Sequence, residues 1–171
     1  MPQACREFDL PDAHATAVLA RSLARSLPRV PAAGCGAVLY LQGDLGAGKT
    51  SCVREFLRAL GVTGLVRSPT YTLVETYTVG ACSYVHVDLY RLNALSEVDE
   101  LGLRDLQASS LLVEWPERGQ GALPPADLVL RLSYAGEGRH ALLLAHSMLA
   151  TSWLENLAYD TSLAPYVSNL T

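Results

Sequence analysis

The segment GDLGAGKT, from Gly43 to Thr50, places three glycines ahead of the only lysine in the chain. This spacing satisfies the pattern G-x-x-x-x-G-K-[ST], which forms a phosphate-binding loop where it joins a strand to a helix. Glycines let successive backbone N–H groups turn toward an anion, and the N-terminus of the following helix adds positive potential. Lys49 supplies a point charge for the β- and γ-phosphates, and the Thr50 hydroxyl is placed to bind Mg²⁺. The segment therefore predicts a nucleotide-binding site.

The identity of the single lysine strengthens this prediction. The other twelve of the 13 Lys and Arg residues are arginines. A compact ammonium fits between phosphate oxygens inside a loop, whereas a guanidinium is a wide planar fork. The alternative, a glycine-rich turn with a surface lysine, does not explain why the one lysine stands here. We expect nucleotide contacts from Gly43, Asp44, Leu45, Gly46, Ala47, Gly48, Lys49, Thr50 and Ser51.

Two acidic residues lie near the ends of predicted strands. Glu114 ends the apolar run in LLVEW, which has the form of a Walker B element, and Asp88 lies in HVDLY. Carboxylates of this kind bind Mg²⁺ or orient water, and the sequence leaves open which acid does which. The alternative for each is an exposed residue at a strand end. His86 lies on the same side of its strand as Asp88, but a separate metal pair would lack a third ligand.

The segment RSPTYTLVETY contains a third candidate. Pro69 stiffens the chain just ahead of Thr70, whose hydroxyl is a candidate for sensing a γ-phosphate. An ordinary threonine-rich strand is the alternative for Thr70. A guanine-reading N/T-K-x-D motif requires a second lysine, which the chain lacks. Adenine nucleotides are therefore favoured by elimination.

Length and composition favour one acidic domain. The 171 residues carry a net charge of −4, which argues against a broad basic surface for nucleic acid. The four cysteines are widely scattered and form no CxxC pair, so we expect buried free thiols in a reducing cytosol. No apolar run is long enough for a signal peptide or a membrane span. We expect a cytoplasmic protein without membrane contacts.

Hydrophobic spacing predicts the elements that hold these residues. Strands and helices follow one another as in an α/β P-loop NTPase fold, with three layers and a mixed, mostly parallel sheet flanked by helices. We expect this domain over residues 1–146, and a C-terminal tail over residues 147–171 that forms a helix packed on the domain. The predicted helices are 11–27, a helix that follows the phosphate loop and is ended by Gly61, a short acidic helix over 95–106 with a capping box between Ser96 and Asp99, and a helix over 147–158. The predicted strands are 6–10, 37–42, 71–79, 82–90, 110–115, 127–134 and 139–146.

Five blocks together resemble one family. GDLGAGKT, SPTYTLVE, HVDLYRL, ELGLRDL and LLVEWPERG occur here in the order typical of the bacterial TsaE (YjeE) family. Its members are small ATPases needed for the N6-threonylcarbamoyladenosine modification of tRNA. The resemblance runs from about Phe8 to Tyr134. It implies a P-loop fold that binds ATP and Mg²⁺, hydrolyses ATP slowly by itself, and works with TsaB- and TsaD-like proteins that hold the tRNA.

The resemblance also implies roles for individual residues. It assigns Lys49 to the phosphates, Thr50 and Glu114 to Mg²⁺, and Asp88 and Thr70 to the support of hydrolysis. These five residues match the family motifs where they stand in this sequence.

Two further positions depend on the resemblance alone. It places Trp115 in the nucleotide site or at a partner face, with a buried core tryptophan as the alternative, and it places Asp12 to Thr16 near the adenine. Ser51 and Cys52 depart from the family, which usually has a second threonine and an apolar residue there. The tail after Ser147 matches no family block, and a partner-binding segment is its alternative.

The leading hypothesis is a weak Mg-dependent ATPase that its partners stimulate, because no arginine has the signature of a cis arginine finger. A small-molecule kinase of the P-loop class is one alternative, although no lid-like insertion with clustered arginines is present. A nucleotide-switched binding module with negligible hydrolysis is the other.

Overall fold

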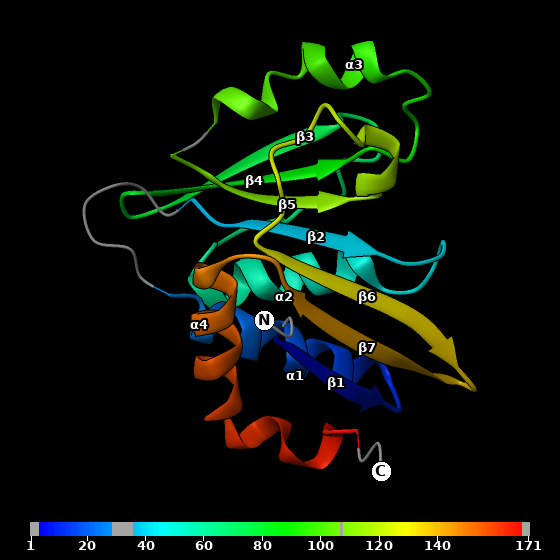
Figure 1. Cartoon of the computed structure of the whole chain (residues 1–171), viewed down its shortest axis with the longest axis vertical. Coiled ribbons are helices and arrows are strands. Elements are labelled where there is room, and N and C mark those ends of the chain that lie inside the picture. Colours follow the sequence, from blue (N-terminus) through cyan, green and yellow to red (C-terminus); the bar gives the residue numbers. More distant parts are fainter. Residues whose placement is uncertain (1–3, 29–35, 107, 169–171) are drawn as a thin grey trace.

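A computed structural model describes residues 4–28, 36–106 and 108–168. Its centre is a seven-stranded sheet in the order β1-β7-β6-β2-β5-β4-β3, which Figure 1 shows from bottom to top. The strands are β1 Cys5–Leu10, β2 Val38–Gln42, β3 Val74–Val79, β4 Cys82–Asp88, β5 Ser110–Glu114, β6 Leu128–Ala135 and β7 Gly138–Ala145.

The sheet is mixed, as predicted, but it is not mostly parallel. β2 pairs in parallel with β5 and with β6, and β4 pairs in parallel with β5. The other three pairings, β1 with β7, β3 with β4 and β6 with β7, are antiparallel. Short turns join β3 to β4 and β6 to β7 and account for two of these pairings, because strands joined by a tight turn run in opposite directions.

Helices cover both faces of the sheet and give the predicted three layers. α1 and α2 lie against one face, behind the strands in Figure 1, and α4 packs beside α1. α3 and the short 3₁₀ helices η1 and η2 cover the other face over β2, β4 and β5. The helices are α1 Ala13–Ser26, α2 Lys49–Leu60, α3 Leu95–Glu100, α4 Met148–Ala158, η1 Leu103–Asp105, η2 Pro116–Gly119 and η3 Thr161–Tyr166.

Alternation along β5 shows how the two apolar cores form. Leu112 faces the core under α1 and α2, whereas Leu111 and Val113 face the core under α3. Successive side chains of a strand point to opposite faces, so a strand buried on both sides is apolar throughout. On α2, Val53 and Phe56 lie one turn apart and are buried against the sheet. This packing fixes the helix that begins at Lys49.

The predicted acidic helix over residues 95–106 is wrong in length and in its cap. α3 ends at Glu100, and Gly102 then adopts a φ of +62° before η1 begins. A positive φ suits glycine and ends a helix. The cap is made by Glu97, whose carboxylate accepts hydrogen bonds from the backbone N–H groups of Asn93 and Ala94 at 3.0 and 2.9 Å.

The C-terminal residues pack on α1 and β1. Trp153 of α4 is fully buried, and its Nε1 donates a hydrogen bond to the Leu23 carbonyl at 2.8 Å. Farther along, Val167 forms an isolated antiparallel bridge with Phe8 of β1. The division of the chain at residues 146 and 147 stays a prediction.

The cysteines differ from the expectation of buried free thiols. Cys52 is a buried free thiol, but Cys5 is an exposed one and Cys82 is disulfide-bonded. Cys35 lies outside the described residues. Among the helices of the described ranges, none is both long and apolar enough to cross a membrane.

Candidate nucleotide-binding site

The topology brings the predicted site residues to one edge of the sheet. The segment GDLGAGKT connects β2 to α2, and Asp88 and Glu114 are the last residues of β4 and β5. These two acids are direct neighbours in the parallel pairing of their strands. Parallel strands end at the same edge, and ligands of open α/β sheets bind there.

The glycines of the loop are required by its backbone. Gly43 and Gly46 have φ values of +142° and +79°. A Cβ on Gly43 would collide with the Leu132 carbonyl oxygen, and a Cβ on Gly46 would lie 2.8 Å from the Tyr134 hydroxyl. Gly48 is the N-cap of α2 and provides no side-chain cap. The first amides of α2 therefore lack a side-chain acceptor, as in helix N-termini that bind anions.

The β6–β7 hairpin donates hydrogen bonds to the carbonyl groups of the loop. The Tyr134 hydroxyl donates to the Leu45 carbonyl at 2.9 Å, and Arg139 donates to the Gly46 and Ala47 carbonyls at 3.2 Å each. In a planar trans peptide, the carbonyl and the next N–H point in opposite directions. Carbonyls turned toward the hairpin therefore turn the following amides away from it. The sequence motifs gave no indication of Tyr134 or Arg139.

Lys49 is held inside the loop. Its side chain is buried, and Nζ donates to the carbonyl oxygens of Gly43 at 2.5 Å and Asp44 at 2.9 Å. The ammonium also lies 3.9 Å from the centre of the Trp115 ring. Burial lowers the pKa of Lys49, although the nearby carboxylates, Glu114 first, oppose that shift. The charge is thus positioned in a partly desolvated place before any ligand arrives.

Thr50 and Glu114 form the first of two hydroxyl–carboxylate pairs. The Thr50 hydroxyl donates to Glu114 Oε2 at 2.9 Å. The other carboxylate oxygen, Oε1, lies 2.8 Å from His86 Nε2. Glu114 is only 2% exposed, so the alternative of an exposed strand-end acid is wrong.

Thr70 and Asp88 form the second pair. The Thr70 hydroxyl donates to Asp88 Oδ2 at 2.9 Å, and the Tyr90 backbone N–H donates to Oδ1 at 2.9 Å. Asp88 is buried. Thr70 lies in a turn ahead of β3, which begins at Val74, so the alternative of an ordinary strand threonine is also wrong.

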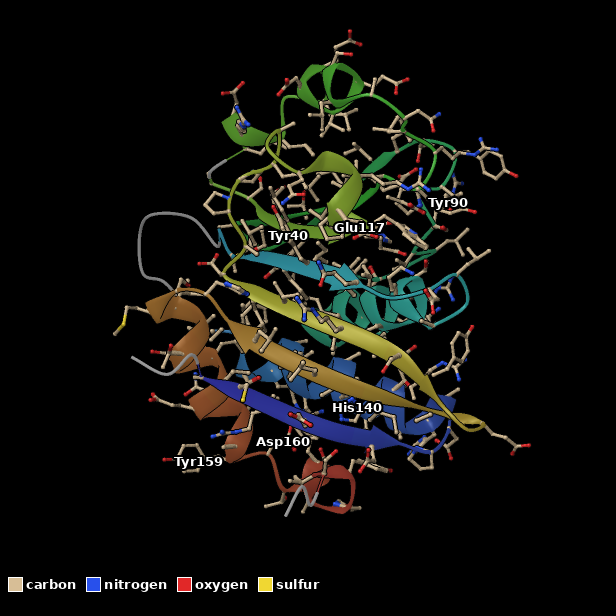
Figure 2. All side chains as sticks on the ribbon, turned by 45° about the vertical axis from the view of Figure 1, so that its right-hand side comes forward. Tyr40, Tyr90, Glu117, His140, Tyr159 and Asp160 are labelled. Carbon is tan, nitrogen blue, oxygen red and sulfur yellow. The ribbon has the colours of Figure 1, made fainter. Side chains whose placement is uncertain are left out.

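Trp115 lies beside Lys49 in the site. Its side chain is only partly buried, and its backbone has a φ of +57°. The centre of its ring lies 5.0 Å from the centre of the Tyr90 ring. Figure 2 labels Tyr90 on the segment that follows β4. A non-glycine residue with positive φ costs of order 1–3 kcal/mol, and such strain clusters at functional sites. The alternative of a buried core tryptophan is wrong.

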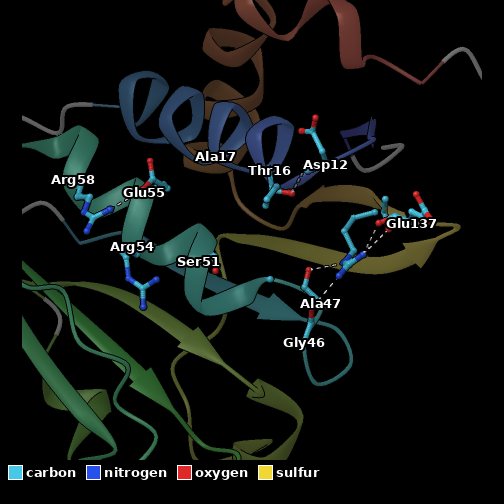
Figure 3. A pocket seen from close by; sticks show the side chains of 14 residues that line it. Asp12, Thr16, Ala17, Gly46, Ala47, Ser51, Arg54, Glu55, Arg58 and Glu137 are labelled. Carbon is cyan, nitrogen blue, oxygen red and sulfur yellow. Dashed lines mark hydrogen bonds and ion pairs between the residues drawn. The ribbon is translucent and has the colours of Figure 1, made fainter.

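The loop separates two cavities. The smaller one, about 280 Å³, is lined by both hydroxyl–carboxylate pairs and by Lys49. The larger one, about 500 Å³, lies between α1, α2 and the β6–β7 hairpin (Figure 3). Gly46, Gly48 and Ser51 line both. Asp12 lines the larger cavity while its carboxylate caps α1 by accepting from the Ala15 N–H at 2.8 Å.

The residues of the smaller cavity fit Mg²⁺. This ion prefers oxygen ligands and is commonly bound by one or two carboxylates together with substrate phosphates. The Thr50 hydroxyl and the Glu114 carboxylate supply such oxygens at the wall of the cavity. Within the described part of the chain, no cluster of three or more His, Cys, Asp or Glu residues could hold a metal alone. A metal here would depend on phosphate oxygens for its remaining ligands.

A phosphate loop between a buried strand and a helix, with acids at the ends of neighbouring parallel strands, defines a P-loop nucleotide-binding protein. Comparison with known proteins narrows this class. Residues 10–141 match the family model described as "Threonylcarbamoyl adenosine biosynthesis protein TsaE". The chain therefore belongs to the TsaE family, as its five sequence blocks predicted.

Individual relatives agree with this assignment. A protein of Haemophilus influenzae named "tRNA threonylcarbamoyladenosine biosynthesis protein TsaE" is 45% identical over 114 residues, which are 66% of this chain and 72% of the relative. A protein of the same name from Synechocystis is 46% identical over 118 residues, 66% of this chain and 71% of the relative. The crystal structure of Bacillus subtilis YdiB superimposes with a TM-score of 0.73 at 27% identity, covering 92% of this chain and 97% of YdiB.

Proposed function

We propose that this chain is the ATP-binding and ATP-hydrolysing subunit of the machinery that makes N6-threonylcarbamoyladenosine in tRNA. Its relatives carry the name of this biosynthesis. The observation that most supports an ATPase is the Thr50–Glu114 hydrogen bond beside the hydrogen bond from Thr70 to the buried Asp88. Both pairs line the cavity that contains Lys49. A passive glycine-rich turn has no need of two buried carboxylates.

Nucleotide binding divides between the two cavities in this proposal. The loop amides, the N-terminus of α2 and Lys49 bind the phosphates. The nucleoside lies in the larger cavity, which is the one that Asp12 and Thr16 line. Its walls combine aliphatic atoms of α1 with Arg54 and Arg139, so they offer both apolar contact and hydrogen-bond donors.

Thr50 and Glu114 would hold Mg²⁺, which neutralises charge on the phosphates when it is bound. Asp88 is then the residue that orients the attacking water. Both oxygens of Glu114 are already engaged, one by Thr50 and one by His86. Asp88 likewise accepts one hydrogen bond at each oxygen, from Thr70 and from the Tyr90 amide, so each oxygen of both acids keeps a lone pair for a ligand. Since Glu114 shares its hydrogen bond with the metal-binding Thr50 hydroxyl, we assign the water to Asp88.

The proposal includes slow turnover by the isolated chain. No arginine is among the described residues that line the smaller cavity. An arginine finger contributes ~10³–10⁵-fold where it acts on a transferring phosphoryl group. The missing charge would come from partners, which we propose to be TsaB- and TsaD-like proteins in the cytoplasm. Since the chain carries a net charge of −4, these partners would supply most contacts with tRNA.

Reconstitution tests this proposal. The purified chain is combined with its TsaB and TsaD counterparts, tRNA, ATP, Mg²⁺ and an activated threonylcarbamoyl donor. Modified adenosine is measured by mass spectrometry and phosphate release by a colorimetric assay. We expect modification to require this chain, and phosphate release to rise when the partners are added. Modification that proceeds equally well without the chain would refute the proposal, and a phosphorylated small molecule formed in step with ADP would identify a kinase.

A further inference from the structure

His86 is a buried histidine whose role in the site is unassigned. It lies on β4, is 0% exposed, and places Nε2 at 2.8 Å from Glu114 Oε1. Its other ring nitrogen, Nδ1, is buried without a hydrogen-bond partner among the described residues. An ionised carboxylate only accepts hydrogen bonds, so Nε2 carries the proton in this contact.

Stability alone does not account for this pair. Burying a carboxylate and an imidazole desolvates both, and an apolar pair of similar volume is often as stable or more stable. The unpartnered Nδ1 adds a further cost of desolvation. Val85 and Val87, on either side of His86, are apolar and face the opposite core. By contrast, His86 and Asp88 place two buried polar groups on the face of β4 that carries Glu114 on the next strand. A polar residue kept at this cost points to a role in the site.

The position of His86 excludes direct contact with a ligand. His86 lines neither the larger nor the smaller cavity, whereas Glu114 lines the smaller one. It also belongs to no cluster of three or more potential metal ligands within the described ranges. The hydrogen bond with Glu114 is what connects His86 to the smaller cavity.

The geometry around Glu114 shows what that effect is. The Thr50 hydroxyl contacts Oε2 and His86 contacts Oε1, so two hydrogen bonds from two elements fix the plane of one carboxylate. With Thr50 alone, the carboxylate would be free to rotate about its terminal bond, because this torsion has a broad energy profile. Outer partners of this kind orient metal-binding carboxylates.

We propose that His86 is a positioning residue that holds Glu114 in the orientation needed for the metal–nucleotide complex. This inference rests on the proposed function, since it requires that Thr50 and Glu114 serve a divalent cation. His86 orients one carboxylate of the site from β4, and Asp88, two residues later on the same face of that strand, supplies the other.

Three substitutions test this role. His86→Gln keeps an N–H donor near the position of Nε2, His86→Asn ends one methylene short of Glu114, and His86→Leu removes the donor at similar volume. Val85→Ala is the matched control, because Val85 is a buried neighbour that faces the opposite core. Binding of Mn²⁺, which prefers the same oxygen ligands as Mg²⁺, is measured by electron paramagnetic resonance with ADP present. Nucleotide affinity in EDTA and thermal unfolding without ligands are measured in parallel.

We expect His86→Leu and His86→Asn to weaken Mn²⁺ binding ~10–100-fold, the usual effect of losing an outer partner. His86→Gln should bind Mn²⁺ more tightly than His86→Asn, and nucleotide affinity in EDTA should stay at the wild-type level. Val85→Ala should lower the unfolding temperature without changing Mn²⁺ affinity. Wild-type Mn²⁺ affinity in His86→Leu, or equal affinities in the Gln and Asn variants, would overturn the positioning role. If the wild-type protein binds no Mn²⁺ with ADP, the proposed function itself fails.

Discussion

Replacing Lys49 with methionine separates a binding role from a structural one. The substitution removes the ammonium and keeps an unbranched apolar chain of similar length. In the free protein, Nζ donates to the Gly43 and Asp44 carbonyls and lies over the Trp115 ring. Burial lowers the pKa of Lys49, which means that the charged form is less favourable here than in water. The lysine therefore gains contacts but loses hydration on folding.

These opposing effects set the expected magnitudes. Two hydrogen bonds from a charged donor contribute about 1.5 kcal/mol each at the low end of their range, and the cost of desolvation offsets most of that sum. We expect the free energy of unfolding to change by about 1 kcal/mol or less. In the nucleotide complex, charged phosphate oxygens replace neutral carbonyls as acceptors, and we expect each bond to move from the low end to the high end of the range of about 1.5–3 kcal/mol for charged groups. The difference, about 3 kcal/mol for two bonds, weakens nucleotide affinity about 100-fold.

Isothermal titration calorimetry with Mg·ATP measures the affinity, and urea unfolding without nucleotide measures the stability. Arg6→Met is the control, because it removes one positive charge from an exposed position on β1. We expect this control to bind like the wild-type protein. The reasoning is refuted if Lys49→Met binds Mg·ATP within about threefold of wild type, or if it loses as much unfolding free energy as binding free energy.

Three further outcomes follow from other parts of the molecule. Trp153→Ala should lower the free energy of urea unfolding by about 3–5 kcal/mol, the usual cost for a buried aromatic; a loss below 1 kcal/mol would contradict the packing of α4 on α1. Burial raises the pKa of Cys52 from 9.0 to about 12, so the stability from its neutral thiol is present below pH 9 and is lost between pH 9 and 12. In unfolding titrations, the free energy of unfolding of Cys52→Ala should therefore fall less steeply over that range than that of the wild type. An equally steep fall would contradict this. Gly46→Ala, which places a Cβ 2.8 Å from the Tyr134 hydroxyl, should reduce Mg·ATP affinity in calorimetry, and wild-type affinity would exclude the close approach.

Local patterns predicted the parts of the site that lie within one short segment. The loop, Lys49 and Thr50 follow from a single motif, and Glu114 and Asp88 follow from acids at the ends of apolar strands. These side chains lie where residues close to them in the sequence place them, because the motif itself forms the connection between strand and helix. The roles assigned to them in binding and hydrolysis stay predictions until nucleotide is measured.

Contacts between distant segments could not be predicted in the same way. Tyr134 and Arg139 reach the loop from 89 to 93 residues away, through a hairpin whose place beside β2 no local pattern reveals. The sequence placed His86 on the same side of its strand as Asp88 and gave it no role, but His86 contacts Glu114 on the neighbouring strand. Its partner depends on the β4–β5 pairing, which is a property of the whole sheet.

The most direct measurement uses the single lysine as a probe. Protein labelled only with ¹⁵N-lysine should give one backbone amide signal in a heteronuclear correlation spectrum, because Lys49 is the only lysine of the chain. The account predicts that this signal moves as Mg·ATP is added and saturates at one nucleotide per chain. A signal that stays in place at saturating Mg·ATP, in a protein that remains folded, would contradict phosphate binding at this loop.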